Sequence, residues 1–233
     1  MKPRRLACAV WIVGLLSVPV TVWAQSATPD KVPGAGMLPP TIPIFPLPDV
    51  MLFPNVSRPL HIFEPRYRAM VADALKGDRI IGMVTLRPGH EADYEGRPPV
   101  HPIGCAGVIT DVEELPDRRF NIVLRGLVKF RVTGEDQSRP YRLARVEAMP
   151  EVPDNAEKEA LHKQRQRLEV LVTEPGSDPR VPPEIPDEEV VNALAQYVPL
   201  DPLERQELLE QEGVLSRSHA LIDLLEMRVK IPR

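Results

Sequence analysis

Residues 42–77 read IPIFPLPDVMLFPNVSRPLHIFEPRYRAMVADALKG and hold the densest set of structural signals in this chain. Ile42, Ile44 and Leu47 alternate with prolines and predict a short strand. Because proline donates no backbone hydrogen bond, we expect this strand to lie at a sheet edge. An apolar run over residues 50–53 follows it and ends at a Pro-Asn turn.

The second half of the stretch predicts an extended segment that leads into a helix. Pro65 suits the first helical turn, where its missing N–H costs nothing. Gly77 supplies the stop signal. The apolar side chains between them follow helical spacing and should form the buried stripe: Tyr67, Met70, Val71, Ala74 and Leu75.

Further β-like runs follow up to Pro150, separated by turn residues. We expect strands over residues 80–86, 103–112, 120–127, 128–132 and 141–148, with a turn at 115–119.

The periodicity becomes helical after Pro150. We expect helices over residues 156–174, 201–213 and 216–228, and another that Asp187 caps. Strands followed by helices predict an α+β fold, with a β domain at 42–150 and an α-helical bundle at 151–233.

The first 24 residues are typical of an export signal. Lys2, Arg4 and Arg5 precede an apolar stretch over residues 6–22, and small residues lead up to Ala24. We expect cleavage near Ala24, a flexible linker over 25–41 and a periplasmic or secreted protein. A retained membrane anchor is the alternative, although the apolar stretch is short for a span.

Composition narrows the choice of partners. A formal charge of −4 and 5% aromatic residues argue against nucleic acid. After signal removal Cys105 would be the one remaining cysteine. Its apolar neighbours favour a buried, unreactive thiol.

Three segments together resemble the substrate-binding N-terminal domain of Lon proteases, as found in stand-alone Lon-domain proteins. They are PIFPL at 43–47 with VMLFP at 50–54, LHIFEPRY at 60–67, and PIGCA at 102–106 leading to NIVLRG at 121–126 and FRV at 130–132. The resemblance covers roughly residues 42–230. It implies a PUA-like β pseudo-barrel followed by a helical bundle.

The catalytic parts of a Lon protease have no counterpart in the sequence. No Gly-Lys pair occurs, so there is no G-x-x-x-x-G-K-[ST] phosphate loop. No serine lies in a G-x-S-x-G elbow. We therefore expect no enzyme activity and no cofactor.

The resemblance implies binding of unfolded or extended polypeptide. Apolar side chains of the β domain could form the binding surface, and edge pairing of the first strand could help: the candidates are Phe45, Phe53, Phe63 and Tyr67. Packing in the core is the alternative for each of them. A second hypothesis is a structural adaptor that docks a partner protein of the cell envelope through the helical bundle.

A third hypothesis concerns the loop over residues 87–102, where His90, Glu91, Asp93 and His101 are possible metal ligands of a hydrolase. Their spacing matches no established zinc pattern, so we expect no metal. For His61, and for Glu64 with Arg66, structural roles are favoured over catalytic ones.

Overall fold

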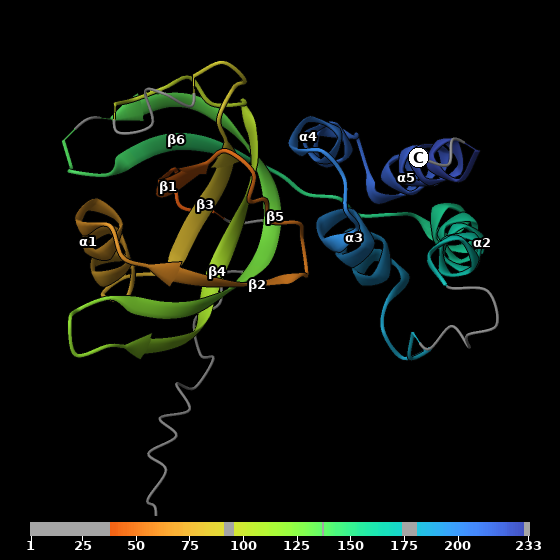
Figure 1. Ribbon diagram of the computed structural model, residues 1–233, viewed down its shortest axis with the longest axis horizontal. Coiled ribbons are helices and arrows are strands. Elements are labelled where there is room, and N and C mark those ends of the chain that lie inside the picture. Colours follow the sequence, from red (N-terminus) through yellow and green to blue (C-terminus); the bar gives the residue numbers. More distant parts are fainter. Residues whose placement is uncertain (1–37, 91–95, 137, 174–180, 231–233) are drawn as a thin grey trace, which may run out of the picture. The chain divides into compact units, whose positions relative to one another are not determined.

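The computed structural model describes residues 38–90, 96–136, 138–173 and 181–230, which lie within one compact unit, Lys31–Arg233. The expected signal and most of the expected linker lie outside the described residues. The described part is α+β, as predicted, with one mixed sheet and five helices (Figure 1). The strands are β1 (Thr41–Leu47), β2 (Ser57–Ile62), β3 (Ile80–Thr85), β4 (Ile103–Glu114), β5 (Phe120–Asp136) and β6 (Arg142–Met149). The helices are α1 (Pro65–Ala74), α2 (Asn155–Val172), α3 (Asp187–Tyr197), α4 (Pro202–Glu210) and α5 (Val214–Lys230).

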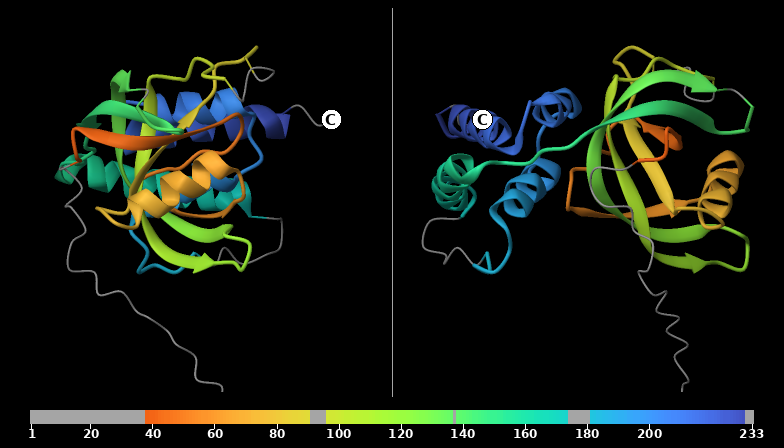
Figure 2. Two further views of the ribbon diagram at one scale, coloured as in Figure 1. Left: turned by 90° about the vertical axis from the view of Figure 1, so that its left-hand side faces the viewer. Right: turned by 180° about the vertical axis from the view of Figure 1, so that it is seen from behind.

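The six strands follow the order β2-β5-β4-β3-β1-β6, and β6 also pairs with β5. Strands β5, β4, β3, β1 and β6 therefore form a closed ring (Figure 2), and among the described strands β2 pairs with β5 alone. The β1–β3 pair is parallel and the other pairs are antiparallel. Closure gives each of the five ring strands two neighbours in the ring, whereas β2 keeps one unpaired edge in the described sheet.

The prediction that the first strand lies at a sheet edge is wrong. β1 pairs with β6 over residues 41–44 and with β3 over residues 44–47, so it has a neighbour on both sides. The two ladders are offset along the strand. Pro43 lies in the first ladder only and Pro46 in the second only. At each proline, β1 is paired with one neighbouring strand and not with both, so the backbone N–H that proline lacks can be missing without disrupting the sheet.

The predicted helix after Pro65 is confirmed as α1, with Pro65 in its first turn and the cap at Leu75. Its buried face holds the predicted stripe except for Leu75, which is partly buried at the cap. Tyr67 packs on Phe45 of β1 with ring centroids 4.3 Å apart. The segment before α1 is extended, as predicted, and forms β2.

Strand β5 runs without interruption through Asp136, where the sequence predicted two separate strands over 120–127 and 128–132. The glycine at the supposed break, Gly126, lies inside β5. It has no room for a side chain, because an added Cβ would lie 2.0 Å from the carbonyl oxygen of Phe53. The glycine therefore marks a close approach of two backbone segments and not a strand end.

The four C-terminal helices contact one another: α5 packs on α2, α3 and α4, and α3 also contacts α2 and α4. The helix predicted from the Asp201–Glu204 pattern is present, and the Asp201 N–H donates to Oε2 of Glu204 over 2.8 Å. Asp154 and Glu157 form a capping box at the start of α2 that we had not predicted.

The expectation that Asp187 caps a helix is wrong, because the N-cap residue of α3 is Pro186. Asp187 is the first helical residue, and its carboxylate bonds instead to α2. Its Oδ1 accepts from Nη1 of Arg165 over 2.9 Å, and its Oδ2 lies 3.1 Å from Nδ1 of His162. An acid in the first turn still complements the helix dipole, which explains why the sequence pattern looked like a cap.

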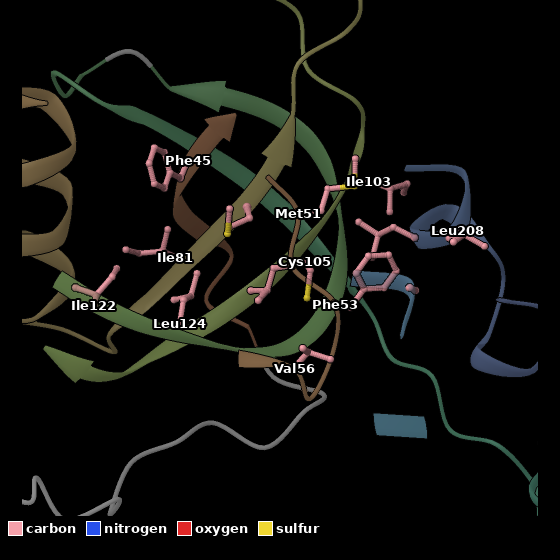
Figure 3. Close-up of a cluster of buried hydrophobic side chains, with 14 of the residues drawn as sticks. Phe45, Met51, Phe53, Val56, Ile81, Ile103, Cys105, Ile122, Leu124 and Leu208 are labelled. Carbon is pink, nitrogen blue, oxygen red and sulfur yellow. The ribbon is translucent and has the colours of Figure 1, made fainter. Parts of the chain in front are cut away.

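One hydrophobic cluster extends from the interior of the ring into the helices. It includes Phe45 of β1 and Ile122 of β5, and it continues through Phe53 to Leu208 of α4 (Figure 3). A second, smaller cluster contains Ile42, Ile44 and Phe130. The strands and the helices therefore share buried apolar surface, which fixes the geometry of the region between them.

Candidate functional site

A cavity of about 560 Å³ lies where β5, residues 150–153 and the starts of α3 and α5 meet. We call it the junction cavity, and we call residues 150–153, which join β6 to α2, the connector. Most of the lining side chains are apolar or proline. The full lining is Pro54, Asn55, Leu127, Val128, Lys129, Pro150, Glu151, Val152, Pro153, Pro186, Glu188, Asn192 and Val214.

The Pro54-Asn55 wall of the cavity is fixed by β5. The N–H of Asn55 donates to the carbonyl of Gly126 over 2.9 Å, and the N–H of Gly126 donates to the carbonyl of Val56 over 2.9 Å. Asn55 has a φ of 63°, a left-handed conformation that asparagine tolerates better than most residues. The turn therefore lies directly on β5 because Gly126 lacks a side chain.

Two polar side chains of α3 hold the same turn from the other side. Nδ2 of Asn192 donates to the carbonyl of Pro54 over 3.0 Å. Oε1 of Gln196 accepts from the N–H of Phe53 over 2.9 Å, and its Nε2 donates to the carbonyl of Ser57 over 3.1 Å. Both side chains are buried, so these bonds are formed away from water.

Three charged side chains form a buried cluster beside the cavity. Oε1 of Glu151 lies 2.7 Å from Nζ of Lys129 and 2.5 Å from Nη2 of Arg217. Lys129 also donates to the carbonyls of Gln211 and Glu212. Lys129 is 1% exposed and Arg217 is fully buried, so Glu151 is the carboxylate that compensates both cations.

The surroundings of this cluster indicate a structural role. Burial lowers the pKa of Lys129, while its hydrogen bond and ion pair with Glu151 offset part of that shift. Arg217 Nε donates to the carbonyl of Leu208 over 2.9 Å, and Nη1 donates to Oδ1 of Asn192 over 2.6 Å. The donors of both cations are thus occupied by protein acceptors. The ion pairs and hydrogen bonds of this cluster therefore link β5, the connector, α3, α4 and α5 beside the cavity.

The four aromatic residues predicted to bind peptide are not brought together at this site. Phe45 and Tyr67 lie in the core, and so does Phe53, whose ring lies under the guanidinium of Arg217 with 5.5 Å from Cζ to the ring centroid. Phe63 differs, with 60% of its surface exposed. Phe63 is thus the member of the predicted set that a peptide can reach in this conformation.

Phe63 follows β2, and its ring stacks on that of His61 at 6.1 Å. Nδ1 of His61 bonds Oδ1 of Asn121 over 2.7 Å, and Nε2 lies 3.2 Å from Nη1 of Arg119. His61 also lines a shallow hollow of about 420 Å³ on the faces of β2, β4 and β5. These contacts link His61 of β2 to Asn121 of β5 and to Arg119, and the structural role of His61 stays a prediction.

Three of the other candidate residues, Glu64, Arg66 and His101, lie close to a side chain that can carry the opposite charge. Glu64 and Arg66 form an ion pair at 3.1 Å, at the entry of α1. His101 Nδ1 lies 3.4 Å from Oε1 of Glu210, whereas Glu91 and Asp93 lie outside the described residues. Within the described ranges, no group of three or more His, Cys, Asp or Glu side chains is placed to hold a metal ion.

Cys105 is fully buried and unpaired, and burial raises the pKa of its thiol. A buried thiol with a raised pKa is a poor nucleophile. Among the described helices, none combines the length and the apolar character that a bilayer span requires.

The fold and the cavity thus define an α+β domain whose closed sheet shares a core with a set of helices. Residues 41–227 match the ATP-dependent protease La (LON) substrate-binding domain. The chain belongs to this family, as the sequence motifs led us to expect.

Sequence relatives include Lon proteases. Lon protease 2 of Myxococcus xanthus is 27% identical over 221 residues, which are 89% of this chain and 27% of the relative. The Lon protease of Trichlorobacter lovleyi is 28% identical over 200 residues, 81% of this chain and 24% of the relative. The chain spans about a quarter of the length of these curated relatives.

Solved structures share the fold. The N-terminal domain of the Mycobacterium avium complex Lon protease matches with a TM-score of 0.59 at 15% identity, over 81% of this chain and 99% of that structure. A Lon N-terminal domain protein from Xanthomonas campestris matches with a TM-score of 0.55 at 22% identity, over 78% of this chain and 97% of that structure.

Proposed function

We propose that this chain binds extended polypeptide segments without hydrolysing them, and that the junction cavity receives their apolar side chains. The observation that carries the proposal is a largely apolar cavity of about 560 Å³ in a chain of the LON substrate-binding domain family. The family match lies in the substrate-binding domain, which supports a binding role and not a catalytic one.

The size and lining of the cavity support an apolar side chain as its occupant. Ligand pockets typically have volumes of roughly 300–1,000 Å³ and mostly apolar walls. Fully burying one leucine or phenylalanine side chain stabilises a complex by about 1.5–3 kcal/mol. One or two such side chains would give weak, reversible binding after the entropic cost of association is subtracted.

Edge pairing with the first strand cannot contribute, since β1 has neighbours on both sides. The cavity and the exposed ring of Phe63 therefore remain as the apolar contact sites on the strand side. The role of Phe63 as a peptide-binding residue remains a prediction.

Val152 offers a direct test of the cavity. It lines the cavity and is 85% exposed, so a change there should not disturb the core. Val152→Asp should weaken binding of a fluorescent leucine-rich peptide by about fivefold or more, measured by anisotropy. Val170→Asp is the matched control, because Val170 is 71% exposed on α2 and does not line the cavity. Equal affinities of both variants and the parent, or no peptide binding by the parent, would refute the proposal.

We also propose that the chain is exported, with residues 1–24 as a cleaved signal. The basic start, the apolar stretch and the small residues before Ala24 support this. Amino-terminal sequencing of protein recovered from the cell envelope should begin near Gln25. Recovery of the full-length chain from the cytoplasm would contradict export, and recovery of the full-length chain from membranes would favour the anchor.

We assign the strand region to the PUA-like pseudo-barrels and the region 151–233 to an α-helical bundle, with the boundary near residue 150. The closed ring of strands and the mutual contacts of α2 to α5 support this assignment.

An adaptor that docks a partner protein through its helices is the second candidate. Val170 on α2 and Met227 on α5 are apolar side chains that are 71% and 53% exposed, and neither lines the junction cavity. The double change Val170→Asp and Met227→Asp should abolish capture of an envelope partner if this candidate holds, and should leave peptide binding at the cavity intact.

A further inference from the structure

The junction cavity adjoins a second hollow, and the connector lines both of them. The second, of about 220 Å³, is lined by the connector together with Glu157, Glu212 and the start of α5. All four connector residues, 150–153, line both hollows, and so does Val214. The two hollows therefore form a continuous surface over the connector.

The charged residues of this surface are mostly acidic. The carboxylates among the lining residues are Glu151, Glu157, Glu188 and Glu212, and the one cation among them is Lys129. Lys129 is 1% exposed and its ammonium bonds Glu151 and two backbone carbonyls, so it is not available to a ligand.

The exposed carboxylates of this surface lack cationic partners. None of the described ion pairs uses Glu188 or Glu212, and the carboxylate of Glu157 accepts from the backbone N–H of Asp154. Glu212 is exposed and Glu188 is partly exposed at the start of α3. A cationic group of a bound molecule would find free acceptors beside the apolar cavity.

We infer that the surface over the connector selects peptide segments in which an apolar residue has lysine or arginine neighbours. This rests on the proposed function and narrows its substrate class. The apolar side chain enters the junction cavity, and the flanking cations face Glu188, which lines this cavity, and Glu212, which lines the second hollow. The buried cluster beside the cavity carries one excess positive charge, but its donors are occupied and its cations are out of contact with solvent.

The contribution of charge should be moderate and sensitive to salt. Exposed ion pairs are weak, so two of them should change the affinity by about fivefold at low ionic strength. Added salt should reduce that difference, because the Debye length falls to about 3 Å at 1 M salt.

The test uses the purified full chain and three fluorescent peptides that share a central leucine pair. Their flanking residues are lysine, serine or glutamate, and anisotropy at low and high salt gives the affinities. The lysine peptide should bind about fivefold more tightly than the glutamate peptide at low salt. In the double variant Glu188→Gln and Glu212→Gln this preference should disappear, while the serine peptide should bind as before.

The matched control is the double variant Glu114→Gln and Glu147→Gln, which removes two exposed carboxylates that do not line either hollow. It should retain the preference for lysine. If all three peptides bind equally, or if the preference survives in the Glu188→Gln and Glu212→Gln variant, the selectivity is refuted while peptide binding stands. If no peptide binds the parent chain, both the proposed function and this inference fail.

Discussion

Nζ of Lys129 lies 2.7 Å from Oε1 of Glu151, and both side chains are almost entirely buried. Lys129 belongs to β5, whereas Glu151 belongs to the connector that leads from the last strand to the first C-terminal helix. Because the same carboxylate also pairs with Arg217 of α5, Glu151 neutralises charge from the sheet and from the helices at once. These two ion pairs hold the connector in position beside the cavity.

Loss of the Glu151 charge should therefore destabilise the whole unit. Glu151→Gln leaves two buried cations without a compensating carboxylate, and removing one partner of a buried ion pair costs about 3–5 kcal/mol. Urea denaturation followed by circular dichroism should show this loss. Glu147→Gln, at an exposed position four residues earlier, should change stability by about 0.5 kcal/mol or less. Similar midpoints for the two variants would contradict a structural role for the cluster.

A side chain at position 126 should displace the turn that forms one wall of the cavity. In Gly126→Ala the new Cβ would lie 2.0 Å from the carbonyl oxygen of Phe53, and such overpacking costs about 1–3 kcal/mol or more. The thermal midpoint should fall and peptide affinity should weaken. Gly77→Ala is the control, because an added Cβ there would have the carbonyl oxygen of Ala74, at 3.9 Å, as its nearest contact, and Gly77 lines neither hollow. A Gly126→Ala variant as stable as Gly77→Ala would show that the turn is free to move.

The aromatic residues singled out from the sequence should separate into two groups by their effect on stability. Phe53→Ala removes a fully buried ring and should cost about 3–5 kcal/mol. Phe63→Ala, at a position that is 60% exposed, should cost about 0.5 kcal/mol or less. Chemical denaturation measures both. If Phe63→Ala also weakens peptide binding without loss of stability, the predicted binding role of this residue gains support.

Cys105 should be unreactive in the folded protein. Burial disfavours the thiolate and raises the pKa of Cys105. The native state therefore keeps the thiol protonated at pH values at which an exposed cysteine ionises. At pH values below the thiol pKa of the unfolded chain, the thiol is protonated in both states and the free energy of unfolding keeps its full value. As the pH rises above that pKa, the unfolded chain loses the proton while the folded chain keeps it, so the free energy of unfolding falls.

The test is labelling with Ellman's reagent at pH 8 in a Cys8→Ser chain, where Cys105 is the one cysteine left. Modification should be slow in buffer and complete within minutes in concentrated urea. Rapid labelling of the native chain would show that this part of the core opens readily.

The sequence alone was sufficient to predict the elements whose signals lie in residues close together in the chain. Pro65 and the apolar stripe that follows it predicted α1, and the Asp201–Glu204 pattern predicted α4. The family could also be recognised, because its motifs are short apolar strings in a characteristic order along the chain.

The errors came from properties that depend on distant neighbours. Three prolines near the start suggested an edge strand, yet β1 has two neighbours because its two ladders are offset. Asp187 looked like a cap, yet its carboxylate bonds Arg165 and His162 of α2, which a local pattern cannot show.

The cavity and its charge cluster could not be predicted at all from the sequence. Lys129, Glu151, Asn192 and Arg217 are polar residues in four different segments, and nothing in their local patterns indicates burial. The order of strands and helices, and the family, follow from local propensity and motif order, which a sequence carries directly. Which polar groups become buried together, and where an apolar cavity remains open, depends on closure of the sheet and on how the helices pack against β5. Only tertiary contacts determine those features, because they bring together residues far apart in the sequence, such as Gln196 and Phe53, which are 143 positions apart.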